Sequence, residues 1–252
     1  MTQPTASGSG AEYDAPSTAK KPEKASLLDD FMDIFYAPSA VFARRANAGF
    51  WIPLLIISVL LGVIFFANRD LIDPIMEAEF ARSMANSAQA RQMTPEQMET
   101  ARKFGGTLGM IFAFIGPPIA MLMLGVVIWI VGKFFDAKQS VNAAVVVAVF
   151  SYVPRVVEGV VNRIQGLLID TSSLNSRFSL TLGLGRFFDP DTTSPLLLGL
   201  IGRIDVFTIW ITVLIAIGLV VTGKIGRGKA AIAAAIVWLA GALPTLASAL
   251  RS

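Results

Sequence analysis

Long apolar runs alternate with polar loops along the chain. Five runs are long enough to cross a hydrocarbon core of about 30 Å at a rise of about 1.5 Å per residue. They cover residues 50–67, 107–132, 141–161, 206–221 and 230–250. The pattern therefore predicts an all-α polytopic membrane protein with five transmembrane helices.

The N-terminal part of the chain has a different pattern. Residues 1–25 hold too few apolar side chains to offset chain entropy, which predicts a disordered cytoplasmic tail. From Ser26, a typical N-cap, apolar residues recur at helical spacing among acids until Pro38 ends the helix. This amphipathic segment either lies in the membrane interface or docks on the bundle. Residues 26–252 are expected to form one five-span domain.

Two long polar loops, residues 68–105 and about 162–204, contain helix starts. Thr94 followed by Gln97 predicts a capped helix that continues into the second span, and Asp205 can cap the fourth. The alternation in residues 178–185 fits a short strand, but a lone strand is weak evidence. The acids after the first span are expected to form a solvated face: Asp70, Asp73, Glu77 and Glu79.

Basic residues predict the orientation. They are concentrated in the two short loops and just before the first span: Arg44, Arg45, Lys133, Lys138, Lys224, Arg227 and Lys229. Lys and Arg near the ends of spans favour the cytoplasmic side. The N-terminus is therefore expected in the cytoplasm and the long loops outside.

Composition narrows the chemistry. The mean hydropathy is +0.63 and only 15% of residues are charged, which is typical of a membrane protein. The absence of Cys and His excludes thiol nucleophiles, disulfides, imidazole bases and Cys/His zinc sites. The chain shows no dense carboxylate cluster for a metal, and a net charge of +3 is too small to indicate nucleic acid. We therefore expect that the protein is not an enzyme and that it binds no cofactor and no metal.

The third span contains polar side chains on one face. Their spacing of four, three and four residues places them on a common seam: Ser151, Arg155, Glu158 and Asn162. A charge at the bilayer centre costs about 2.5–3.5 kcal/mol, so the seam should face protein or water. Three interpretations stay open: an Arg155–Glu158 ion pair that holds helices together, emergence of the helix into the outer interface, or a path for a solute or lipid.

Prolines and small residues mark helix bends and packing faces. Pro117 and Pro118 predict a kink in the second span, and Pro154 another in the third. Each kink is either a hinge or a packing device. Gly116 with Ala120, and the alanines from 230 to 242, allow close helix packing within the chain or against a second copy.

Three stretches resemble the bacterial branch of the Yip (Ypt/Rab-interacting protein) domain family. They are "DIFYAPSAVFARR" before the first span, "SYVPRVVEGV" in the third and "IDVFTIWITVLIAIGLVVTGK" around the fourth. The resemblance implies a five-helix core, a cytoplasmic N-terminus and the bacterial inner membrane. Asp33, Tyr36 and Pro38 approximate a family motif, D-L-Y-G-P, with one extra residue and no Gly.

These features together favour a non-enzymatic membrane organiser or adaptor that acts through its N-terminal segment. Its expected partners are membrane lipids, a protein bound at that segment and a second copy of the chain. The alternative is a transporter or lipid scramblase that uses the polar seam of the third span.

Overall fold

The computed structural model describes residues 25–85 and 92–243. Its helices are α1 (Leu27–Tyr36), α2 (Pro38–Arg45), α3 (Trp51–Ala67), α4 (Arg69–Ala85), α5 (Pro95–Lys133), α6 (Val141–Ser151), α7 (Val153–Gly166), α8 (Pro195–Ile201), α9 (Val206–Gly223) and α10 (Arg227–Ala240), with short 3₁₀ turns η2 (Thr171–Ser173) and η3 (Leu184–Phe187). The described ranges contain no β-strand. Residues 178–185 form turns leading into η3 instead, with one isolated bridge between Gly183 and Asp205.

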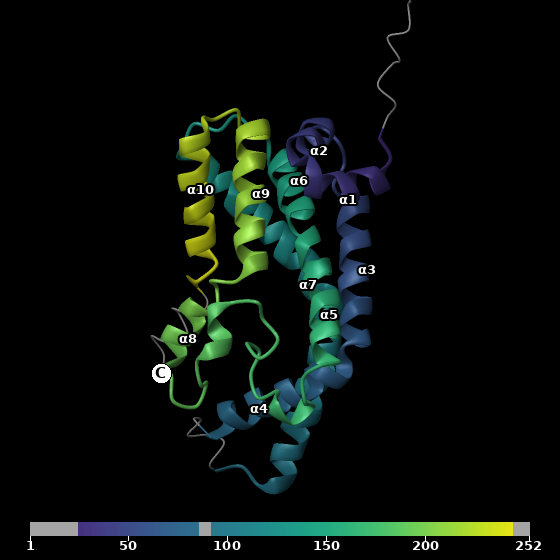
Figure 1. Ribbon diagram of the computed structural model, residues 1–252, viewed down its shortest axis with the longest axis vertical. Helices are drawn as coiled ribbons and strands as arrows, with labels where there is room; N and C mark the ends of the chain where they lie inside the picture. Colours follow the sequence, from purple (N-terminus) through teal and green to yellow (C-terminus); the bar gives the residue numbers. More distant parts are fainter. Residues whose placement is uncertain (1–24, 86–91, 244–252) are drawn as a thin grey trace, which may run out of the picture.

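The helices form an elongated bundle (Figure 1). We call one end the basic end: it holds α1, α2 and the turns at residues 134–140 and 224–226. The other end, the loop end, holds α4, α8 and the connection 167–205. The short basic loops and the N-terminal helices therefore lie at the same end, as predicted from the positions of the basic residues.

Three helical segments of the described chain are long and apolar enough to cross a membrane: α5, the α6–α7 pair taken as 141–166, and α9. A fourth candidate is α3 taken with α4, although α4 turns away from α3 by 80°. Helix α10 has 14 residues and covers only residues 230–240 of the expected fifth span, and residues 244–250 lie outside the described part. The structure therefore shows a multi-helix membrane architecture, and the number five stays a prediction.

The core is centred on α6, which is buried from Ala143 to Ser151. Glycines let its neighbours approach closely: a Cβ at Gly125 of α5 would lie only 2.7 Å from the Cα of Val145. The alanine-rich face of α10 is also buried within the chain. Gly116 differs, because a Cβ there would meet nothing within 4 Å. That Gly116 packs against a second copy of the chain stays a prediction.

The prolines act differently in the two predicted bends. Helix α5 continues for 39 residues through Pro117 and Pro118 without a break. The third span is interrupted at Tyr152, where α6 ends and α7 begins with Pro154 in its first turn. Proline fits there because the first turn of a helix does not need its missing amide donor.

The two turns at the basic end are joined. The amide of Lys138 donates to the carbonyl of Gly223 at 2.9 Å. Beneath this contact, the buried Thr222 hydroxyl donates to the Gln139 side chain at 2.6 Å. These bonds fix the α5–α6 hairpin to the α9–α10 hairpin.

Candidate functional site

A buried carboxylate holds α1 and α2 together. Asp30 is fully buried and accepts bonds from Arg44, at 3.0 Å from Nε and 2.7 Å from Nη2, and from Arg45. Arg44 also binds Asp33 at 2.6 Å. These bonds to Asp30, and then to Asp33, raise the pKa of the Arg44 guanidinium above its ordinary value. Because such charge-assisted bonds are strong, the hairpin is a locked unit.

One face of α1 docks on the bundle. Ile34 is fully buried. Phe31 packs against Phe150 of α6, with ring centroids 5.7 Å apart, and Phe35 meets Trp210 of α9 edge-on at 5.3 Å. The sequence left open whether this segment lies in the membrane interface or docks on the bundle. The face with Phe31, Ile34 and Phe35 docks on the bundle.

The opposite face of α1 is open. Leu28, Met32 and Tyr36 are 71%, 61% and 85% exposed, and their spacing of four residues makes one continuous apolar row. The exposed Asp29 is next to this row, and bonds from the Ser26 side chain and backbone hold the pKa of its carboxyl below the ordinary value. The row is therefore apolar with an acidic border.

The three residues of the predicted cytoplasmic motif do not form one cluster. Asp33 binds Arg44, Tyr36 is the last residue of α1 and Pro38 is the first of α2. The pattern did not single out Asp30, which is the centre of the cluster. The sequence did contain a signal for it. Asp30 lies four residues before Ile34, so the two side chains share one face of α1, and that face is apolar and buried.

The polar seam of the third span is partly assembled. Arg155 Nη1 lies 2.5 Å from Glu158 Oε2, and Arg155 Nη2 lies 2.9 Å from the Thr208 hydroxyl of α9. Thr208 in turn donates to Asp205, the residue that caps α9. The seam thus connects α7 to the loop-end start of α9.

The other two seam residues do not join this network. The Ser151 hydroxyl is buried and has no hydrogen-bond partner among the described residues. Asn162 accepts a long bond, 3.5 Å, from Gln165. The Arg155–Glu158 pair is real in the structure, while the role of the seam stays a prediction.

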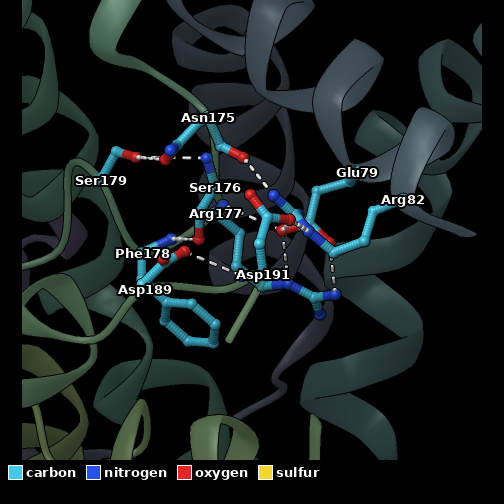
Figure 2. Close-up of polar contacts among 9 residues, drawn as sticks. All are labelled: Glu79, Arg82, Asn175, Ser176, Arg177, Phe178, Ser179, Asp189 and Asp191. Atoms are coloured by element: carbon cyan, nitrogen blue, oxygen red, sulfur yellow. Dashed lines mark hydrogen bonds and ion pairs between the residues drawn. The ribbon is translucent and has the colours of Figure 1, made fainter. Parts of the chain in front are cut away.

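A second polar network ties α4 to the loop that follows α7 (Figure 2). Glu79 accepts from the backbone amide of Arg177 at 3.2 Å and from its Nη2 at 2.9 Å. Arg82, one turn along α4, donates to Asp191 at 2.8 Å and to the carbonyl of Asn175 at 3.1 Å. Partial burial opposes ionisation of Glu79, but the bonds from Arg177 outweigh it and the pKa of the carboxyl lies below its ordinary value.

The expectation that the acids of α4 form a solvated face is therefore wrong for Glu79, and it holds for Asp70, whose side chain is 59% exposed. Glu79 is half-buried in the network above, and Asp70 binds Arg163 of α7 at 2.6 Å. The loop folds back over α4 and supplies Arg177, while Arg163 comes from α7. The other two acids pair within exposed helix surfaces, Asp73 with Arg69 and Glu77 with Arg102.

Long apolar helices, with basic turns gathered at one end and side-chain polar networks near both ends, define a polytopic α-helical membrane protein. The Yip1 domain family matches residues 32–248, and the chain belongs to that family. The chain is similar to membrane protein YknW of Bacillus subtilis (strain 168), with 26% identity over 223 residues that cover 86% of each chain. No solved structure matches it. The family resemblance expected from the three quoted stretches is thus confirmed.

Proposed function

We propose that this Yip1-domain protein is a non-enzymatic organiser or adaptor of the bacterial inner membrane, and that it acts through the exposed face of α1. The observation that carries the proposal is the locked α1–α2 hairpin. Asp30 locks α1 to α2, and Phe31 and Phe35 dock α1 on the bundle. The hairpin leaves Leu28, Met32 and Tyr36 uncovered. A rigid apolar row is suited to binding because little entropy is lost when it is covered.

The border of this row favours a protein partner over anionic lipid. Asp29 carries negative charge beside the row, and the charges of Arg44 and Arg45 are engaged by Asp30. Negatively charged headgroups attract basic segments, so they have little attraction to this face. The partner should present apolar side chains bordered by Lys or Arg.

The proposed topology has five spans and a cytoplasmic N-terminus. The 17 residues of α3 rise about 26 Å, close to the thickness of the hydrocarbon core. Orientation is supported by the basic turns, which share an end with α1 and α2. Because the sequence has no Cys, single cysteines can test this cleanly. We expect an impermeant maleimide to label Ser172→Cys on intact spheroplasts, and Gly228→Cys only after permeabilisation; the reverse result would overturn the orientation.

The adaptor function is tested by photo-crosslinking in cells. A benzophenone amino acid at Met32 should form an adduct with a specific protein, and the same probe at Ile232, an exposed position on α10, should not. The Asp30→Asn substitution should weaken the Met32 adduct because it releases the hairpin. Absence of any protein adduct from positions 28, 32 and 36 would overturn the proposal. An unchanged phenotype and unchanged co-purifying partners after deletion of residues 1–42 would also overturn it.

A further inference from the structure

A cavity of about 340 Å³ lies between α5 and α7 in the loop-end half of the bundle. Helix α3 packs against both α5 and α7, which have little contact with each other, and it forms the back wall. Ile72 of α4 and Leu180 of the long loop line the cavity toward the loop end. Phe112, on its rim, is 59% exposed, and so the cavity opens onto the apolar outer surface of α5.

The cavity has one apolar side and one polar side. Leu61, Ile64 and Phe65 of α3 and Phe112 of α5 provide the apolar side. The polar side comes from α7 and from the end of α3: Arg155, Glu158, Asn162 and Asn68. A ligand that matches both sides is an amphiphile.

The polar side has unused hydrogen-bond acceptors. Asn68 is only 5% exposed, and its Nδ2 donates to the carbonyls of Ile64 and Gly159 at 3.0 and 3.1 Å. These bonds fix the orientation of the amide, and no donor among the described residues reaches its Oδ1. Glu158 binds Arg155 through Oε2, and its other oxygen accepts no bond from the described part of the chain. A buried acceptor without a donor is costly, which favours a ligand that supplies one.

We infer that this cavity binds the headgroup of a phospholipid that carries hydrogen-bond donors, with an ammonium headgroup as the best match. An ammonium group offers three donors, which suits the free oxygen of Glu158. The Asn68 Oδ1 is sealed from solvent and would accept a second donor after a shift of its side chain. A headgroup that offers only a phosphate fits less well, because Arg155 is already engaged by Glu158 and Thr208. At 340 Å³ the site is at the small end of ligand cavities, so it admits the headgroup while the acyl chains remain along α3 and α5.

The test is lipid-dependent thermal stability of the full chain in detergent micelles. Phosphatidylethanolamine, its mono- and dimethyl derivatives and phosphatidylcholine share their chains and differ in the number of N–H donors, from three to none. We expect the rise in melting temperature to fall along this series, with an apparent affinity for phosphatidylcholine about tenfold or more below that for phosphatidylethanolamine. Equal effects of the two end members would overturn the inference.

A matched pair of variants locates the effect. Ala113→Phe fills the cavity from α5, whereas Ile115→Phe adds volume on the 50% exposed face of the same helix. The first should abolish the selectivity for phosphatidylethanolamine and the second should retain it. Selectivity that survives in a folded Ala113→Phe protein would place the lipid elsewhere. If that variant does not fold, native mass spectrometry of the wild-type protein decides: preferential retention of phosphatidylethanolamine over phosphatidylcholine supports the site, and equal retention overturns it.

Because the cavity and the α1 row lie at opposite ends of the bundle, these tests are independent of the adaptor tests.

Discussion

Two buried carboxylates, Asp30 at the basic end and Glu158 at the loop end, are satisfied in different ways. Asp30 is 0% exposed and receives two arginines that return from α2, one on each oxygen. Glu158 is 15% exposed, receives one arginine from its own helix, and faces a cavity with its other oxygen. A fully bonded cluster favours a structural lock, while a partly bonded one leaves capacity for a ligand. Asp30 therefore stabilises the fold, whereas Glu158 retains an oxygen that can bind a ligand.

The largest effect is expected from Asp30→Asn. The substitution leaves Arg45 without a carboxylate partner among the described residues and Arg44 with Asp33 alone, and should lower the free energy of unfolding by about 3 kcal/mol. Thermal unfolding in detergent measures this, and hydrogen exchange in α1 should increase strongly. The control is Asp29→Asn, an exposed neighbour that keeps an oxygen for the Ser26 cap. Equal stability of the two variants would contradict the lock.

A smaller effect is expected from breaking the Arg155–Glu158 pair. Arg155→Met and Glu158→Gln should each cost about 1–2 kcal/mol, below the usual loss for a buried pair because the cavity can admit water. The double variant should recover part of the loss, which a double-mutant cycle measures as coupling. If all three proteins are as stable as the wild type, the charges are not structural, and liposome flux assays on Glu158→Gln become the next measurement.

Thr208→Val should have a still smaller effect. It keeps the shape of the side chain but removes the hydroxyl between Arg155 and Asp205, for an expected loss of about 1 kcal/mol. The loss should shrink when Arg155→Met is already present. Thr212→Val is the control, because that hydroxyl only donates to a carbonyl of its own helix. Identical losses in both threonine variants would show that the link to α7 adds nothing.

The smallest and most local effect concerns pH at Glu79. Its pKa is lowered in the folded protein, so its contribution is present above the unfolded pKa of about 4.3 and is lost as the pH falls through the lower folded value. Exchange of the Arg177 amide, which donates to Glu79, should be slower in wild type than in Glu79→Gln at neutral pH. The difference should disappear in acid. A constant difference across this range would contradict the linkage.

The sequence predicted the local features of the fold well. The caps at Ser26, Thr94 and Asp205 are confirmed, since each depends on residues within one helical turn. The Arg155–Glu158 contact was foreseen for the same reason. The Asp30 cluster was not, because its arginines arrive only after the chain reverses between α1 and α2. Nor could the pairing of Glu79 with Arg177 be predicted, since it joins residues 98 positions apart through a loop whose path has no sequence pattern.

Helix α5 has a mechanical consequence. Its 39 residues measure about 58 Å, nearly twice the thickness of the hydrocarbon core. Residues 95–106 precede its apolar run, and there Arg102 pairs with Glu77 of α4 at 3.2 Å. Pro117 and Pro118 remove two amide donors along its length and create a compliant point. A bend at these prolines would move the N-terminal part of α5, together with α4 through the Arg102–Glu77 pair, relative to the rest of the bundle.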